Sequence, residues 1–332
     1  MPGARAPAWL LSLAAVAALA ALAFVLPTYP LIVGTEIFVL ATFALGFNLL
    51  FGYAGLLSFG QAAYFGVGAY AAGLLLLHGP RSVWLALGGG CAAAALAALV
   101  LGALAVRRDE IYFSILTLGL GMMVYTVAFN WRDVTGGSDG LTGFPVPRLD
   151  LGFADLPLAR PRNMYLLCLA SLSVVALVLR RVVASPFGLL LRATRENRDR
   201  VAFVGGSVVR VRLAAFVLSG AICGLAGVLF ALFNRIATPD MAHWSFSARP
   251  VLMSILGGSG TFLGPVVGAA AFLGLEQLVT RWTQDWLFVL GLVLVPIVLF
   301  FPRGLVGTAE ALLARRRAPP AAAPGGAGEG AS

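Results

Sequence analysis

Side chains that carry out covalent or metal chemistry are few in this 332-residue chain, and they are widely spaced. The two histidines, His78 and His243, stand at the edges of apolar stretches, and no apolar stretch holds paired carboxylates or a histidine with a carboxylate at helical spacing. The three cysteines, Cys91, Cys168 and Cys223, are far from one another and from either histidine. This spacing predicts neither disulfides nor a metal site. We therefore expect no catalytic residue, no metal and no cofactor.

Two carboxylates stand inside apolar stretches, Glu36 and Glu276. Charged groups are costly within lipid and often mark functional sites there. Glu276 could face a polar pathway or carry a proton. The alternative is that each carboxylate lies close enough to the membrane surface to be hydrated, because the cost falls away from the bilayer centre.

The composition is that of a membrane protein. Hydrophobic residues make up 60% of the chain and charged residues only 11%, and the mean hydropathy is +0.94. Apolar stretches of roughly 20 residues, long enough for a helix to cross the hydrocarbon core, recur along the chain. We expect an all-α polytopic membrane protein with about eight full transmembrane helices, at residues 9–26, 31–51, 54–78, 83–106, 111–130, 164–179, 213–233 and 286–301.

The arginines predict the orientation. All 23 basic residues are arginine, and eight of them flank or occupy residues 185–208, the charged segment, against only Glu196 and Asp199. By the positive-inside rule this segment is cytoplasmic. The neutral loop 131–162 fits the external side. Alternation then places both termini in the cytoplasm, provided that residues 246–280 cross an even number of times, as a re-entrant pair or as two short spans.

Two glycine-rich breaks interrupt the apolar pattern. The first break contains Gly52 and Gly55, and the second contains Gly257 and Gly260. Aligned on these glycines, each break follows an apolar piece and precedes a Gly-Ala pair, so the two halves look like diverged repeats. Transporters built from repeats place broken helices near the membrane midplane, where the freed backbone faces a cavity. The alternative is that the glycines only let helices pack closely.

The charged segment is too polar for lipid, yet it is patterned like a helix. From Leu189 to Phe203, apolar residues at both ends enclose a charged middle, which is typical of a short interfacial helix, and Gly205 and Gly206 can terminate it. Such a helix offers a surface to a cytoplasmic partner. The alternative is a solvated loop whose arginines only determine the topology.

Six motifs follow one another along the chain: GYAGLLSFGQAAYFGVGAY at 52–70, YFSILTL at 112–118, TGGSDGL at 135–141, SPFG at 185–188, RATREN at 192–197 and GGSGTFLGP at 257–265. In this order they resemble the LivM-type permease subunits of branched-chain amino acid ABC importers, over residues 30–305. Short glycine runs are common in membrane helices, so the resemblance depends on the six motifs together.

The resemblance implies a subunit that pairs with a second, homologous permease. Two cytoplasmic ABC ATPases would lie below the pair, and an extracytoplasmic substrate-binding protein above it. It also implies that the charged segment docks in a groove of an ATPase. The ATPase-coupling residues that it suggests are Arg192, Ala193, Arg195, Glu196, Asn197 and Gly205.

The resemblance further implies a translocation pathway bordered by the breaks. Small polar residues can serve such a pathway, although they also hold transmembrane helices together. Residue 61 is glutamine where many members of the family carry histidine, so no titrating side chain is required there. Our pathway candidates are Asn48, Gly52, Gly55, Ser58, Gln61, Tyr64, Thr117, Gly257, Gly258, Ser259 and Gly260.

The external loop contains a second glycine-rich motif, with Thr135, Gly137, Asp139 and Gly140. It could form a turn near the substrate entrance or a contact for the binding protein. A plain surface turn explains the same residues, because glycine and aspartate favour turns.

We expect a transmembrane permease domain at 1–305 and a disordered cytoplasmic tail at 306–332, rich in Pro, Ala and Gly. The expected function is the permease subunit of an ATP-driven ABC importer for branched-chain or other hydrophobic amino acids, working by alternating access in the bacterial inner membrane. Related permeases serve urea and short amides, which leaves that substrate class open. An ion-coupled secondary transporter would explain the breaks but not the charged segment, and a membrane enzyme would need catalytic residues that the sequence lacks.

Overall fold

The structure is a computed structural model that describes residues 8–145, 147–150, 155–282, 288–289, 291–292, 296 and 304–308. Its regular elements, in chain order, are α1 (Ala8–Val25), α2 (Thr28–Asn48), the π-helix η1 (Leu49–Ala54), α3 (Gln61–His78), α4 (Val83–Ala105), α5 (Glu110–Asn130), α6 (Arg132–Thr135), the 3₁₀ turn η2 (Gly137–Asp139), β1 (Leu141–Thr142), β2 (Arg148–Asp150), β3 (Asp155–Pro157), α7 (Pro161–Ala184), α8 (Pro186–Glu196), α9 (Arg198–Phe203), α10 (Val208–Asn234), β4 (Ile236–Ala237), the 3₁₀ turn η3 (Pro239–Ala242), α11 (Trp244–Gly257) and α12 (Gly264–Thr280).

Helices make up most of the described chain, as the sequence predicts for a polytopic membrane protein. Five helical stretches of the described part are long and apolar enough to cross a membrane: Thr28–Ala54, which joins α2 to η1, and α4, α5, α7 and α10. The helices α1 and α12 are apolar but shorter. The span expected at 286–301 lies largely outside the described residues, as does the tail after residue 308.

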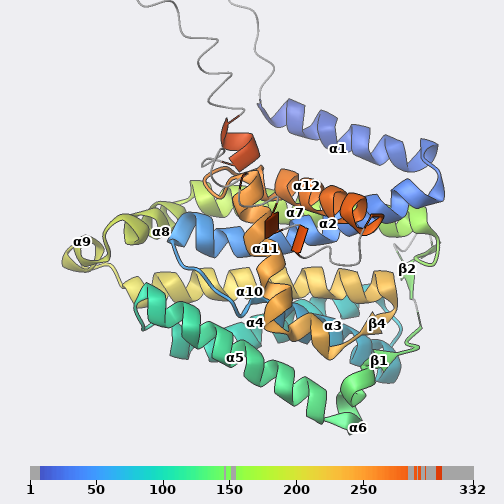
Figure 1. The fold of residues 1–332 in the computed structure, drawn as a ribbon, viewed down its shortest axis with the longest axis horizontal. Helices are drawn as coiled ribbons and strands as arrows, with labels where there is room; N and C mark the ends of the chain where they lie inside the picture. The colour runs from blue at the N-terminus through green and yellow to red at the C-terminus, as the bar shows by residue number, and fades with distance from the viewer. Residues whose placement is uncertain are drawn as a thin grey trace, which may run out of the picture.

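The helix α10 lies at the centre of the bundle and packs against α2, α3 and α4 (Figure 1). Close approach depends on small residues: a Cβ added at Gly68 of α3 would collide with the carbonyl of Gly224 in α10. A Cβ at Gly227 would likewise meet the backbone of Phe65. At Gly68, one of the glycines that follow the first break, the packing interpretation therefore holds.

The two ends of the bundle differ in secondary structure. The helices α8 and α9 lie at one end, and the short strands lie at the other (Figure 1). Two antiparallel pairs form there, with Leu141 opposite Ala237 and Leu149 opposite Leu156. The structure therefore places the charged segment and the loop 131–162 at opposite ends, the arrangement that the arginine distribution predicts.

Residues 244–280 form a tight helical hairpin, α11 and α12. The 14 residues of α11 rise only about 21 Å, short of the ~30 Å hydrocarbon core. Glycines bring the two helices together, because a Cβ at Gly257 would overlap the carbonyl of Gly264 and one at Gly268 would overlap the carbonyl of Met253. This hairpin is the arrangement expected of a re-entrant pair or two short spans.

Candidate functional site

The charged segment contains two helices rather than one. Ser185 caps α8, accepting a hydrogen bond from the Gly188 amide at 3.4 Å. The chain leaves helical geometry at Asn197, whose side-chain oxygen accepts a hydrogen bond from the Arg200 amide at 3.0 Å and so begins α9. The expectation of a single helix from Leu189 to Phe203 is wrong at this residue, because asparagine is a preferred helix N-cap.

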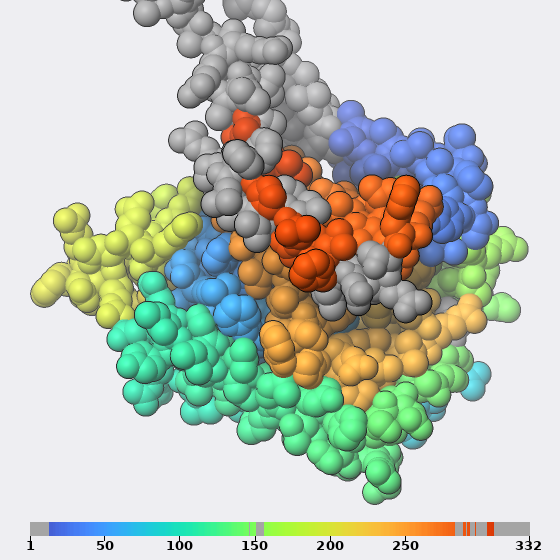
Figure 2. All heavy atoms as spheres, viewed as in Figure 1, coloured from blue at the N-terminus to red at the C-terminus, as the bar shows by residue number. Residues whose placement is uncertain are grey.

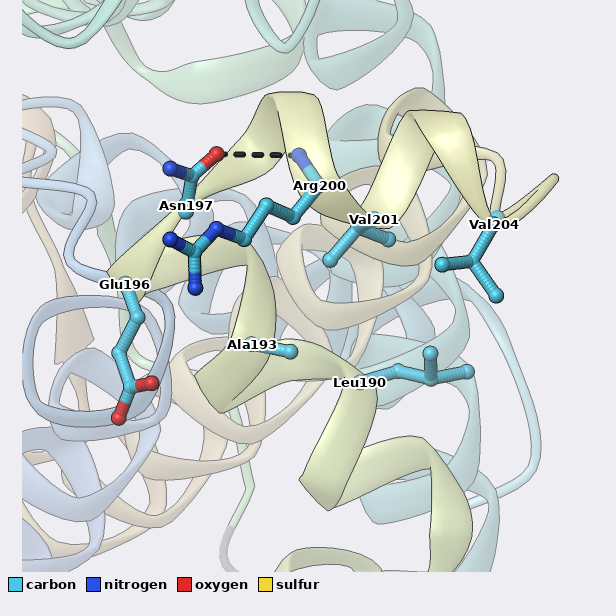
Figure 3. A pocket seen from close by; sticks show the side chains of 8 residues that line it. Leu190, Ala193, Glu196, Asn197, Arg200, Val201 and Val204 are labelled. Carbon is cyan, nitrogen blue, oxygen red and sulfur yellow. Dashed lines mark hydrogen bonds between the residues drawn. The ribbon is translucent and has the colours of Figure 1, made fainter.

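The outer surface of the charged segment is apolar and grooved. Leu189, Phe203 and Val204 have exposed fractions of 64%, 91% and 90%. The segment projects from the body at one end of the molecule (Figure 2). An open groove of about 560 Å³ runs between α8 and α9 (Figure 3) and is lined by Leu190, Ala193, Glu196, Asn197, Arg200, Val201, Val204 and Gly206.

The inner side of α8 contacts the first break. The Nη1 atom of Arg195 donates a hydrogen bond to the Gly52 carbonyl of η1. The stem of the same side chain lies against Gly55, where an added Cβ would stand 2.8 Å from the Arg195 Cγ. The Arg192 guanidinium lies over the Tyr53 ring at 5.3 Å from its centroid. Two of the residues expected to couple to an ATPase thus also bind η1.

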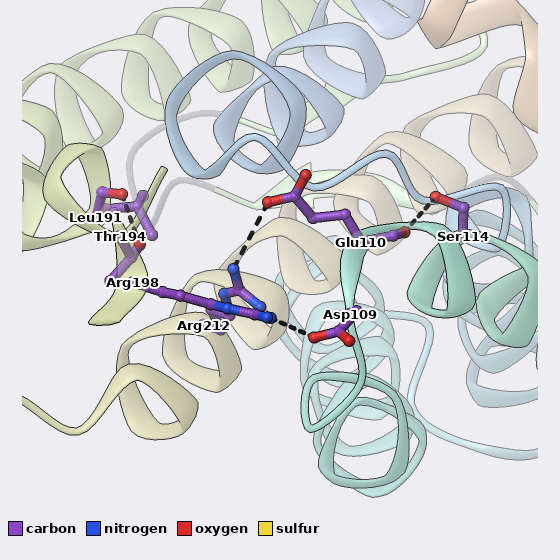
Figure 4. Close-up of polar contacts among 7 residues, drawn as sticks. All are labelled: Asp109, Glu110, Ser114, Leu191, Thr194, Arg198 and Arg212. Carbon is purple, nitrogen blue, oxygen red and sulfur yellow. Dashed lines mark hydrogen bonds and ion pairs between the residues drawn. The ribbon is translucent and has the colours of Figure 1, made fainter. Parts of the chain in front are cut away.

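Ion pairs join the charged segment and α10 to the turn between α4 and α5 (Figure 4). Arg198 of α9 pairs with Asp109, and this hydrogen-bonded carboxylate raises the pKa of the exposed Arg198 guanidinium above its ordinary value. Arg212 of α10 is buried and lies 3.9 Å from Glu110. Asp109, Glu110 and Arg212 carry no sign of these partners in the sequence, since Asp109 and Arg198 alone are 89 positions apart.

The first break is an irregular connection held in place by neighbouring helices. The π-helix η1 ends at Ala54, the next residue Gly55 has a left-handed φ of 72°, and α3 begins only at Gln61. The expected continuous helix from residue 54 to 78 is therefore wrong over its first turns. Ser114 donates to the Leu57 carbonyl at 2.7 Å, and Thr117 accepts from the Phe59 amide at 3.3 Å.

Ser247 fixes the start of α3 from another part of the chain. Its hydroxyl accepts a hydrogen bond from the Ala62 amide at 2.9 Å, satisfying one of the free amides of that helix end. Ser247 lies in α11, 185 positions further along. Sequence reasoning missed this residue, because a serine in an apolar helix carries no sign of a distant partner.

The two breaks touch each other. A Cβ added at Gly52 would collide with the Ser259 carbonyl at the tip of the α11–α12 hairpin. Gly258 has a φ of 107°, so both breaks turn on a glycine with positive φ, Gly55 in the first and Gly258 in the second. Gly260 is exposed, and none of the described residues lies within 4 Å of a Cβ added there.

Most of the polar pathway candidates lie inside the chain, whereas Ser259 is partly exposed. Tyr64 packs edge-on against Phe216 at 5.5 Å between ring centroids. The side-chain atoms Asn48 Oδ1 and Gln61 Nε2 are buried and have no hydrogen-bond partner among the described residues. The candidates buried in this arrangement are Asn48, Ser58, Gln61, Tyr64 and Thr117.

Comparison with known proteins identifies the family. Residues 29–298 match the family described as branched-chain amino acid transport system / permease component. The chain belongs to this permease family. No solved structure matches it.

Three relatives illustrate the range of this family. The chain is 27% identical over 79% of its length to the high-affinity branched-chain amino acid transport system permease protein LivM of Salmonella typhimurium, and 28% identical over 79% to LivM of Escherichia coli. It spans 66% of the length of each. It is also 32% identical to the autoinducer 2 import system permease protein LsrC of Salmonella paratyphi B, over 38% of this chain and 39% of that protein.

In this permease the glycine-rich motif at residues 135–140 forms a turn. The Thr135 hydroxyl lies 2.6 Å from the carbonyls of both Ala128 and Trp131 and is buried, so it fastens the turn to the end of α5. Gly137 and Gly140 have φ values of 64° and 72°, which glycine adopts readily. Asp139 is exposed. Three of the four expected residues thus build the turn, and Asp139 is the one presented to solvent.

A charged cluster joins α2 to the α11–α12 hairpin. Arg249 of α11 donates a hydrogen bond to Glu276 of α12 at 3.2 Å, and both side chains are largely buried. Glu36 of α2 lies near both charges and, with Glu276, lines an open pocket of about 350 Å³. The two carboxylates singled out in the sequence therefore meet. Arg249 was not among the residues singled out in the sequence, although an arginine beside an apolar stretch is a signal that could have identified it.

Proposed function

We propose that this chain is a transmembrane permease subunit of an ATP-driven ABC importer, and that its substrate is a branched-chain or other hydrophobic amino acid. The observation that carries the proposal is the charged segment, a projecting pair of helices with exposed apolar residues and a groove of about 560 Å³. Family membership and the printed names of the LivM relatives support the same conclusion.

The proposed assembly contains a second, homologous permease, two cytoplasmic ATPases that grip the charged segments, and an extracytoplasmic substrate-binding protein at the end that carries the strands. Exposed Leu189 and Phe203 suit a partner of this kind, since removal of apolar surface from water drives most protein–protein association. The chain would lie in the bacterial inner membrane with both termini cytoplasmic, and the α11–α12 hairpin would complete an even number of crossings.

Translocation would proceed by alternating access around the two breaks. In the present arrangement the breaks are packed on each other, and Asn48 Oδ1 and Gln61 Nε2, which have no hydrogen-bond partner in the described part of the chain, are buried beside them. Buried polar atoms without partners are costly. Rearrangement of the breaks would expose these atoms to water or to the charged ends of an amino acid, as expected of a pathway built from diverged repeats.

The proposal is tested by purifying the tagged chain from its native membrane in mild detergent. We expect a second permease and two ATPases to copurify with the wild type. Ala193→Arg fills the groove with a charged side chain, so this variant is expected to lose the ATPases and keep the second permease. Ser138→Arg, at an exposed residue of the opposite end, is the matched control and is expected to keep all partners.

Reconstituted vesicles then separate the alternatives. ATP-dependent uptake of leucine with an added binding protein supports the amino acid importer. Uptake of urea or a short amide instead of leucine would change the substrate assignment but leave the ABC importer assignment unchanged. A wild-type chain that purifies alone and moves solute without ATP would show instead an ion-coupled secondary transporter.

A further inference from the structure

Arg195 joins two elements that the proposed mechanism must move together. It lies in α8, the first helix of the charged segment, and its guanidinium reaches the Gly52 carbonyl of η1, 143 positions away. Its stem lies on Gly55, the residue at which the first break turns. A larger residue at 55 would displace the arginine, so this contact depends on glycine.

The accepting carbonyl lies where a helix needs a partner. Gly52 is in the last turn of η1, and the carbonyls of a last turn have no following turn to donate hydrogen bonds to them. A cation is favoured at this helix end by the helix dipole. Arg195 therefore caps η1 from another element, with a charge-assisted hydrogen bond that is stronger than a neutral one.

The contact continues into the hairpin. Gly52 packs directly on the Ser259 carbonyl at the tip between α11 and α12. Arg195, Gly52 and Ser259 thus form one continuous series of contacts from the charged segment to both breaks. Arg198, three residues further along the segment, pairs instead with Asp109 in the turn before α5, so the two arginines fasten the segment to different parts of the bundle.

We propose that Arg195 is a positioning residue that transmits displacement of α8 to the two breaks, and that its guanidinium works inside this chain rather than as a contact for the ATPase. This inference rests on the proposed function, because the displacement of α8 is the one that the proposed ATPases would impose on the charged segment. Loss of Arg195 should then separate ATP hydrolysis from transport while the ATPases remain bound.

The test compares Arg195→Met, which keeps an apolar stem and removes the donor, with Arg195→Lys, which keeps a charged donor. Each is reconstituted with the second permease, the ATPases and the binding protein, and ATP hydrolysis and leucine uptake are measured together. For Arg195→Met we expect uptake per ATP to fall roughly tenfold, the factor for one charge-assisted hydrogen bond. Arg195→Lys should recover part of that loss. Arg210→Met, at an exposed arginine of the first turn of α10, is the matched control.

A second measurement reports the movement itself. Spin labels on Gly260→Cys at the hairpin tip and Ser138→Cys at the opposite end give a distance with and without trapped nucleotide. In a background without the native cysteines, we expect the nucleotide-dependent change in that distance to vanish in Arg195→Met and to persist in Arg210→Met.

The outcomes are distinct. If Arg195→Met matches the wild type in uptake per ATP and in the label distance, or if it loses the ATPases as Ala193→Arg is expected to do, the inference is overturned and the importer assignment stands. If the wild type itself binds no ATPase, the proposed function is wrong and the inference falls with it.

Discussion

At Gly52 the absence of a side chain lets the Ser259 carbonyl and the Asn48 side chain approach the backbone closely, and the Gly52 carbonyl accepts the hydrogen bond from Arg195. An added Cβ would stand 2.6 Å from Asn48 Oδ1 and would overlap the Ser259 carbonyl. The Ser259 carbonyl is part of the backbone, so it cannot move aside as easily as a flexible side chain. The glycine is therefore required here for close approach, and not for its backbone angles, which are helical in η1.

A substitution tests this at the scale of one methyl group. Gly52→Ala is expected to lower the free energy of unfolding in detergent by about 1–3 kcal/mol, the usual cost of overpacking. Gly260→Ala is the matched control, since no residue of the described part of the chain lies within 4 Å of a Cβ at that position. Its effect should stay within about 0.5 kcal/mol. Equal stability of the two variants would contradict the contact between the breaks.

At the scale of elements, the α11–α12 hairpin is closed by different contacts along its length. Near the tip, Gly257, Gly264 and Gly268 bring the two backbones together. Towards the other end, Arg249 and Glu276 form an ion pair with exposed fractions of 24% and 16%. An intact pair of this kind adds little net stability to the fold. Removing one partner is destabilising, because the other charge is then left poorly solvated.

A double-mutant cycle measures this ion pair. Arg249→Met and Glu276→Gln are each expected to lower the free energy of unfolding by about 1.5–3 kcal/mol, the range for a hydrogen bond to a charged group. The double variant should lose less than the sum of the two, because both single variants break the same contact. Strict additivity would show that the two side chains do not interact.

At the scale of the whole molecule, the charged segment and the turn at residues 135–140 lie at opposite ends of the bundle (Figure 1). Phe203 and Ser138 are both exposed at these ends. A maleimide that cannot cross membranes should therefore label Ser138→Cys on intact cells, and Phe203→Cys only after permeabilisation. Of the native cysteines, Cys168 and Cys223 are buried and Cys91 is partly buried, so the unsubstituted chain provides the background. Labelling of both variants on intact cells would overturn the proposed orientation.

The sequence by itself determined the class of protein and the location of its unusual segments. Apolar stretches long enough to cross a bilayer must become helices there, because lipid offers no hydrogen bonds to the backbone. The glycines marked both breaks, and the arginines marked the charged segment. These signals are local: in each case the residues that cause the feature follow one another in the sequence.

Only the tertiary structure decided which of these segments touch. The charged segment divides at Asn197 because the side chain of this residue caps the N-terminus of α9. The bond from Arg195 to Gly52 and the packing of Gly52 on Ser259 join residues more than a hundred positions apart. No periodicity or composition records such a pairing, because it arises when helices pack and bring distant backbone groups within reach of one another.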